Sequence, residues 1–233
     1  MIKQCRTIGI FFLIALGLNI AQAGDDLSPR DVVLTTSQKV LEELKDKNVN
    51  VNDNPEFFYE IANKYIVPHF NFSRLSQRAL GKYWRDATDQ QKTDFTDQFR
   101  QLLLRTYIVA LTKYSAQDLS TFIKDKIQVP PVNYPPNAKR VDVKVIAERD
   151  GGGDPANITL RLYLDKEKDW KVDDVLVEGI SLITNYRAEF SNKIRTNGMQ
   201  ALIDELASHN KEVMEKKATN DDKSSQKTKS DKK

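Results

Sequence analysis

The chain has 233 residues, with 36 Lys and Arg against 33 Asp and Glu, two His and one Cys. A single cysteine excludes an internal disulfide, and two histidines without further cysteines are too few for a His/Cys metal cluster. Residues 24–210 contain 26 basic and 28 acidic side chains, a nearly neutral balance that argues against a nucleic-acid-binding domain.

The first 23 residues have the pattern of a secretory signal peptide. Lys3 and Arg6 precede an uncharged apolar run, and Ala21-Gln22-Ala23 has the small-x-small pattern of a cleavage site. The run has about fourteen residues, fewer than the roughly twenty of a membrane-spanning helix, which makes a retained anchor the less favoured alternative. Cys5 precedes the run, so it is not placed for lipid attachment at the cleavage site. We therefore expect an exported protein, cleaved after Ala23.

The first half of the mature chain shows helix signals. Serine, asparagine or threonine stands at each expected start. A proline follows it in two of the four helices and a capping box in a third, and proline or glycine stands at two of the expected ends. Apolar residues recur between these signals at helical spacing. We expect four helices: from Ser28-Pro29 to about Lys47, from Asn54-Pro55 to Pro68, from Ser73 to Leu80 before Gly81, and a long one after the capping box Thr88–Gln91.

The middle of the chain changes to the period-two pattern of β-strands. A strand is expected near residues 121–129, before a proline-rich stretch. Three clearer alternations follow, Val141–Ala147, Ile158–Leu164 and Trp170–Val177. The last one slips by one residue at Asp173-Asp174. A β-bulge there would return the later apolar residues to the same face.

These alternations predict a curved antiparallel sheet with one apolar and one polar face. The expected pairs between the second and third alternations are Leu164–Trp170, Leu162–Val172, Leu160–Val175 and Ile158–Val177. Across the turn at Gly151-Gly152-Gly153, the expected pairs are Val143–Leu162 and Val145–Leu160.

Two helices are expected to close the domain. The apolar stripe from Leu182 to Ile194 should end at Asn197-Gly198 in a left-handed cap, and a second stripe runs from Met199 to Leu206. The Lys- and Ser-rich residues after 217 have no apolar pattern and are expected to be disordered. The predicted organisation is a signal peptide at 1–23, one α+β domain at 24–217 and a tail at 218–233.

No catalytic motif occurs in the sequence, and two questions stay open. Asp173, Asp174 and Glu178 could project into an apolar cup as general bases with raised pKa, although exposure to water is the favoured alternative. His69, beside Pro68, is interpreted as structural. The apolar sheet face could be a packed core, which is the default, or the wall of a ligand cavity.

The segment Trp170–Arg187, WKVDDVLVEGISLITNYR, resembles the signature of the MlaC family. Pro68–Phe72, Leu80–Trp84 and Gly198–Ile203 resemble the same family, so the likeness extends over about residues 28–207. This family comprises the periplasmic phospholipid-binding components of the maintenance-of-lipid-asymmetry, or toluene-tolerance, transport system. The resemblance implies an NTF2-like arrangement around an apolar cavity and a function as a carrier without cofactor or catalysis.

The resemblance also implies the partners: a phospholipid ligand, an inner-membrane ABC transporter complex and an outer-membrane lipoprotein–porin complex. We expect a monomer. The alternatives are an NTF2-like enzyme that uses Asp173 or Asp174 as a base, and a periplasmic adaptor with a solid core. Joined to the sheet register, the resemblance predicts these residues in contact with acyl chains: Val143, Val145, Leu160, Leu162, Val172, Val175, Val177, Phe99, Leu103, Tyr107, Tyr186 and Phe190.

Overall fold

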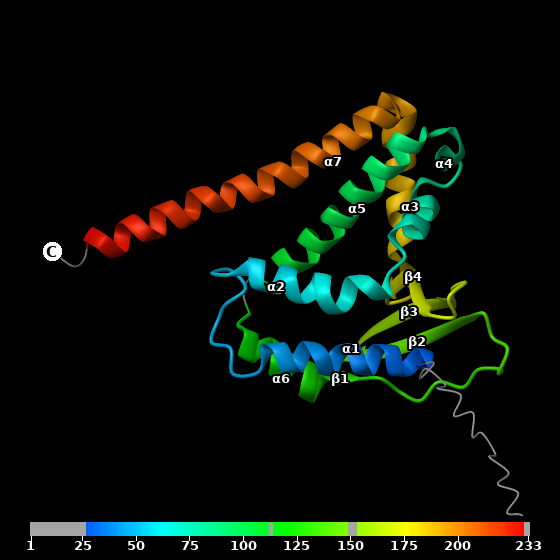
Figure 1. Cartoon of the computed structure of the whole chain (residues 1–233), viewed down its shortest axis with the longest axis horizontal. Helices are drawn as coiled ribbons and strands as arrows, with labels where there is room; N and C mark the ends of the chain where they lie inside the picture. Colours follow the sequence, from blue (N-terminus) through cyan, green and yellow to red (C-terminus); the bar gives the residue numbers. More distant parts are fainter. Residues whose placement is uncertain (1–26, 112–113, 149–152, 231–233) are drawn as a thin grey trace, which may run out of the picture.

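The computed structural model describes residues 27–111, 114–148 and 153–230. The expected signal peptide and the turn residues Gly151 and Gly152 lie outside these ranges. The described chain folds into helices on both sides of one antiparallel sheet, as Figure 1 shows, so the α+β class is confirmed.

The N-terminal half is helical, and its capping residues act where the sequence places them. Ser28 accepts a hydrogen bond from the Asp31 N–H, and Thr88 and Gln91 form a capping box. Gly81 ends its helix with a φ of 57°, a conformation that favours glycine. The helices are α1 (Pro29–Leu44), α2 (Pro55–Ile61), the π-helical turn η1 (Ala62–Ile66), the 3-10 turn η2 (Val67–His69), α3 (Phe72–Leu80), α4 (Tyr83–Asp86), α5 (Asp89–Ala110) and α6 (Ala116–Lys126).

Helix α6 replaces most of the strand predicted near residues 121–129. Ser115 and Asp118 form a capping box, and Ala116, Leu119 and Ile123 contact the same core cluster at helical spacing. Only Ile127 and Gln128 pair as a strand, β1. The prediction of a strand was therefore wrong for residues 121–126, because the helix-start signal at Ser115 was overlooked.

The sheet has five strands in the order β1-β2-β3-β4-β5, all antiparallel. The long strands are β2 (Arg140–Ala147), β3 (Ala156–Leu164) and β4 (Trp170–Val177), and β5 (Ile180–Ser181) is short. All four pairs predicted between β3 and β4 are confirmed. The bulge is confirmed as well, because Arg161 pairs with Asp174 and Leu162 pairs with Val172.

The register predicted between β2 and β3 was wrong by two residues. Val143 pairs with Leu160 and Val145 pairs with Ile158, instead of Leu162 and Leu160. A shift of two residues leaves every side chain on its face, so the alternation pattern cannot distinguish the two registers. Ala156 and Asn157 belong to β3, which shortens the connection and fixes the actual register.

The last helix, α7 (Leu182–Ser230), is bent at Gly198. Gly198 has φ 87° and ψ 167°, so it interrupts the helix in an extended, glycine-specific conformation and not in the predicted left-handed cap. The helix also includes residues 218–230, where the sequence predicts disorder. No Gly or Pro after Gly198 interrupts the helix, although residues 218–230 are mostly Thr, Asn, Asp and Ser, which are weak helix formers.

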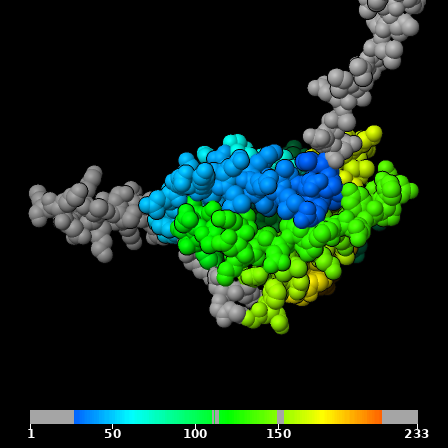
Figure 2. Space-filling view, turned by 90° about the horizontal axis from the view of Figure 1, so that it is seen from below, coloured from blue at the N-terminus to red at the C-terminus, as the bar shows by residue number. Residues whose placement is uncertain are grey.

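The two halves of α7 lie on either side of α5 in Figure 1, while α1 lies on the other side of the molecule beside the sheet and α6. Figure 2, seen from below, shows α1 in blue alongside the green segments of α6 and the chain that leads into β2. Three apolar clusters hold these layers together. One joins α3, α5 and α7, the second joins α1, α2, α5 and α6, and the third joins α1 to the sheet.

Candidate functional site

One face of the sheet is apolar across all three long strands. Val141, Val143, Leu162 and Val172 are almost completely buried there, and Val32 of α1 packs on them. Each strand contributes alternate residues to this face, as the period-two pattern of the sequence requires. The apolar layer expected from the sequence is therefore present.

The apolar face is closed at one end and open at the other. Leu162 is 1 % exposed, whereas Val177 is 40 % and Ile180 59 % exposed. Leu160 and Val175, a cross-strand pair between these ends, are partly buried against the same cluster. Accessible apolar side chains thus continue from the packed core toward the β4–β5 turn.

The helical candidates belong to a different cluster. Phe99 and Phe190 are fully buried, and their ring centroids lie 5.5 Å apart in an edge-to-face contact. Leu103 and Tyr186 pack against this cluster, and the Tyr186 ring lies 5.1 Å from that of Phe99. The twelve predicted contact residues therefore form two groups, with seven on the sheet and five on or beside the aromatic core of α5 and α7.

Phe70 connects the two groups. Its side chain packs against both the sheet cluster and the aromatic helix cluster, and its backbone forms a bridge with Val172. Its ring also stacks on Phe72 at 6.0 Å. The apolar surface of the sheet is thus continuous with that of the helices.

Tyr107, near the end of α5, combines exposure with an interior environment. Its side chain is 45 % exposed, yet burial raises the pKa of its hydroxyl. Burial also raises the pKa of Tyr186, with smaller contributions from Tyr107 and Glu189. The two phenols are therefore neighbours. Nearby protein atoms raise the pKa of both hydroxyls, while the Tyr107 ring is still accessible to solvent.

The opposite face of the sheet carries a buried group of charges at the bulge. Asp173 is 0 % and Asp174 1 % exposed, so the favoured prediction that the bulge exposes them to water was wrong. Arg74 Nε of α3 lies 2.8 Å from Asp173 Oδ2, and Arg78 Nη1 lies 2.8 Å from Asp173 Oδ1. Arg140 and Arg161, the other two arginines of this group, lie 3.2 Å from Asp173 and 3.8 Å from Asp174.

Asp174 also fixes the start of α7. Its carboxylate accepts hydrogen bonds from the Ser181 hydroxyl and from the N–H groups of Val175 and Ile183. Because Asp174 pairs with Arg161 across the strands, it lies on the polar face, away from Leu160 and Leu162. The two carboxylates are thus placed to hold α3, β4 and α7 together and not to act as bases in an apolar cup.

The arginine partners of these carboxylates were not found from the sequence. Arg74 and Arg78 stand four residues apart on α3, a spacing that places both on one helix face. That spacing was the available signal, but their distance of about a hundred residues from Asp173 in the chain hides the pairing. Glu178, the third acidic candidate, is exposed and accepts a hydrogen bond from the Asn157 N–H.

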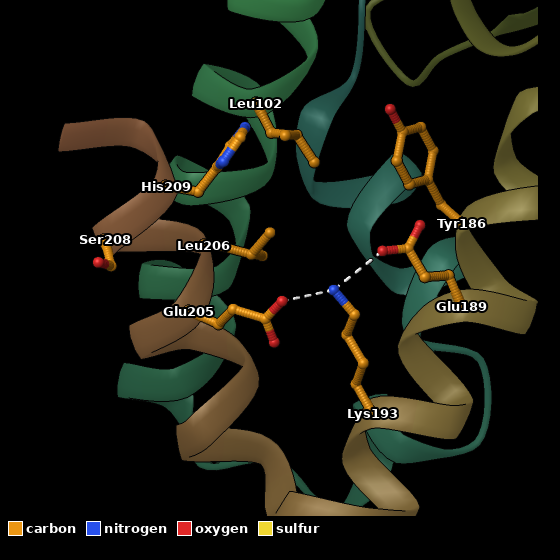
Figure 3. Close-up of a pocket in the computed structure, with 8 residues that line it drawn as sticks. All are labelled: Leu102, Tyr186, Glu189, Lys193, Glu205, Leu206, Ser208 and His209. Atoms are coloured by element: carbon orange, nitrogen blue, oxygen red, sulfur yellow. Dashed lines mark hydrogen bonds and ion pairs between the residues drawn. The ribbon is translucent and has the colours of Figure 1, made fainter. Parts of the chain in front are cut away.

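A pocket of about 590 Å³ lies between the two halves of α7 and α5. Figure 3 shows Lys193 reaching between Glu189 and Glu205, with Tyr186 and His209 at the other end. Lys193 Nζ lies 2.6 Å from Glu205 and 3.0 Å from Glu189, which ties the halves of α7 together across the bend. The pocket is lined by Leu102, Tyr186, Glu189, Lys193, Glu205, Leu206, Ser208 and His209. Tyr186 is the only predicted contact residue among them, and none of them belongs to the sheet.

Within the described residues, no three His, Cys, Asp or Glu side chains come together as ligands for a metal ion. The same residues include no helix with the length and apolar character needed to cross a membrane. The arrangement they form is that of an α+β binding domain, with a large apolar sheet face that is partly accessible and a polar face held by ion pairs.

Comparison with known proteins gives the family. The family model described as MlaC protein matches residues 34–208, so the chain belongs to the MlaC family. It is 28 % identical over 173 residues to the toluene tolerance protein ttg2D of Pseudomonas putida, which covers 73 % of this chain and 75 % of that protein. It is 22 % identical over 206 residues to the intermembrane phospholipid transport system binding protein MlaC of Haemophilus influenzae, covering 88 % and 92 % of the two chains.

A solved structure resembles most of this fold. It is the phospholipid-binding protein from Ralstonia solanacearum in complex with a phospholipid, and it superposes with a TM-score of 0.65 at 25 % sequence identity. The match covers 79 % of this chain and 98 % of that one.

Proposed function

We propose that the protein is a periplasmic phospholipid carrier that moves lipid between an outer-membrane complex and an inner-membrane ABC transporter complex. The observation that carries this proposal is the likeness of the fold to a phospholipid-bound protein, over 98 % of that protein's chain. Membership of the MlaC family and the partly accessible apolar sheet face support it.

The physical task of such a carrier is to keep acyl chains out of water. Exposing one methylene costs about 0.8 kcal/mol, so a diacyl lipid with roughly thirty of them meets a barrier on the order of 20 kcal/mol when it leaves a bilayer unaided. An apolar, water-excluding site lowers this barrier without catalytic groups. The proposed function therefore includes no bond chemistry, and the burial of Asp173 and Asp174 in ion pairs on the polar face agrees with that.

The exposure of the candidate residues divides them into two roles. Val143, Val145, Leu162 and Val172 are buried and form the floor of the proposed lipid site, and Phe99 and Phe190 are the core that supports its helical wall. The residues in direct contact with acyl chains are the accessible or partly accessible ones: Leu160, Val175, Val177, Leu103, Tyr107 and Tyr186.

Tyr107 and Tyr186 are neighbouring phenols of the proposed helical wall, and burial raises the pKa of both hydroxyls. Tyr107 is nevertheless 45 % exposed, so its ring is accessible to a ligand. The predicted signal peptide, with no cysteine at its cleavage site, agrees with release of the mature domain into the periplasm.

The direct test is to purify the exported protein without detergent and to analyse an organic extract by mass spectrometry. We expect phospholipid at a stoichiometric level. A protein that carries no lipid and takes none up from phospholipid vesicles would contradict the carrier function and favour an adaptor.

A pair of variants on β3 tests the site itself. Leu160→Gln places an amide on the accessible apolar face, whereas Thr159→Gln places the same amide on the polar face of the same strand. We expect Leu160→Gln to reduce the lipid retained per folded molecule and Thr159→Gln to retain it at the wild-type level. Equal retention by both variants would place the lipid elsewhere.

A further inference from the structure

Arg100 lies in the middle of α5 and is partly exposed to solvent. Its Nη2 donates a hydrogen bond of 2.6 Å to the amide oxygen of Asn63, and its guanidinium lies 5.9 Å from the centroid of the Phe72 ring. Within the described part of the chain, no ion pair involves Arg100. A guanidinium has five N–H donors, and a neutral amide leaves both its charge and most of these donors available to a ligand.

The arginines of the polar sheet face are different. Arg74, Arg78 and Arg140 all lie within 3.2 Å of a carboxylate oxygen of Asp173. These guanidiniums have their counter-ions within the protein. The partner of Arg100 would have to come from outside.

Helical spacing places Arg100 on the same stripe of α5 as Leu103 and Tyr107, three and seven residues further on. These are two of the residues proposed to contact acyl chains. The stripe spans about 10 Å along the helix axis at about 1.5 Å per residue. An amphipathic ligand that contacts Tyr107 and Leu103 with its apolar part can therefore reach Arg100 with a polar group.

A second route also connects Arg100 to the apolar sheet face. Its guanidinium lies over Phe72, Phe72 stacks on Phe70, and Phe70 bridges to Val172 of β4. Asn63 belongs to η1, a π-helical turn, and such turns occur frequently at functional sites. Arg100 and Asn63 are both accessible to solvent, so they lie at the rim of this apolar region.

We propose that Arg100 binds the phosphate group of the phospholipid, at the rim of the site whose walls hold the acyl chains. This inference rests on the proposed carrier function and deepens it. The phosphate is the part that phospholipids with different head groups share, and guanidinium donors match its oxygens in a charge-assisted, bidentate geometry. The predicted consequence is preference for a lipid with a phosphate over one without it.

The test is a competition between a phospholipid and a diacylglycerol with the same acyl chains, loaded onto the delipidated mature protein and counted by native mass spectrometry. Wild-type protein should prefer the phospholipid. Arg100→Gln should lower that preference about tenfold, the effect of one charge-assisted hydrogen bond, and Arg100→Lys should retain part of it. Arg85→Gln, at an exposed position of α4, loses the same charge away from the site and should keep the full preference.

The outcomes distinguish the role of Arg100 from the proposed carrier function. Unchanged preference in Arg100→Gln overturns the role of Arg100 and leaves the carrier function standing. Failure of the wild type to take up either lipid contradicts the carrier function. If Arg100→Gln does not fold by circular dichroism, unchanged preference in Arg100→Met, which keeps the length of the side chain without its charge, or in Arg100→Lys overturns the proposal.

A phospholipid and a free phosphate ion present the same phosphate oxygens to Arg100, and an assay with inorganic phosphate distinguishes these two ligands. We expect millimolar phosphate neither to raise the melting temperature of the delipidated protein nor to displace bound phospholipid. A rise that disappears in Arg100→Gln, without any lipid preference, would assign the site to free phosphate and overturn the lipid assignment.

Discussion

The two faces of the sheet bury side chains by different physical means. On the apolar face, Val143 and Leu162 lose contact with water because other apolar groups of α1 and the sheet cover them. On the polar face, Asp173 and Asp174 are equally buried, but each is held by guanidiniums from α3 and neighbouring strands.

This difference has a consequence for function. Apolar contacts are non-directional, so the apolar face can exchange one partner for another, such as an acyl chain, at little cost. The ion pairs require particular atoms at particular distances, and removing one partner leaves a buried charge uncompensated. The polar face therefore fixes the positions of α3, β4 and α7, and in the proposed function the apolar face takes the ligand.

The largest effect is expected from Asp174→Ala on the polar face. The change leaves Arg78 and Arg161 without this counter-ion and removes the acceptor for Ser181 and two backbone N–H groups. We expect a loss of about 3–4 kcal/mol in the free energy of unfolding, measured by urea denaturation. Asp142→Ala, where the carboxylate is exposed and lies 3.6 Å from Arg161, is the control and should cost roughly 0.5 kcal/mol.

Leu162→Ala tests the apolar face at its closed end. Leu162 is 1 % exposed, so truncation leaves a cavity and should reduce the free energy of unfolding by about 3 kcal/mol. Leu160→Ala, on the same strand and face but partly exposed, should reduce it by about half as much. Equal losses in the two variants would show that the face is packed uniformly, against the open end proposed for the lipid.

Arg105→Met examines a buried cation with one unpartnered donor nitrogen. Arg105 of α5 is 8 % exposed, and its Nη1 atom has no hydrogen-bond partner among the described residues. An apolar side chain of similar length removes the desolvation penalty of the cation, so we expect a gain of about 1 kcal/mol. A loss of stability in thermal or urea unfolding would show that Arg105 is compensated as well as the polar-face arginines are.

The smallest effect is expected at His69, where the chain passes from η2 toward the sheet. Burial, followed by the charges of Lys171 and Lys39, lowers the pKa of His69 below 6.5. The folded state therefore favours the neutral ring. This contribution to stability is complete above the ordinary pKa and is lost as the pH falls from there through the lowered pKa of the folded state. His69→Asn should remove this slope from the free energy of unfolding measured between about pH 8 and about pH 5.

Much of the fold could be predicted because its signals are local. The capping residues Ser28, Asn54 and Thr88 start helices where the sequence places them, and the slip at Asp173-Asp174 gives the bulge and the β3–β4 pairing. The site was predicted less completely. Local patterns place Leu160 and Tyr107 on faces of their own elements, but they do not show which faces meet.

Three features could be predicted from the amino-acid sequence because each is encoded in residues close together in the chain: the α+β class, the apolar and polar faces of the sheet, and the segment by which the MlaC family is identified. The register between β2 and β3 required the three-dimensional fold, since two registers that differ by two residues leave the same residues on the same face. The fold also shows that Arg74 and Arg78 neutralise Asp173, and that Arg100 has no such partner among the described residues. These are contacts between distant segments, and the charge pattern along the chain does not specify which arginine meets which carboxylate.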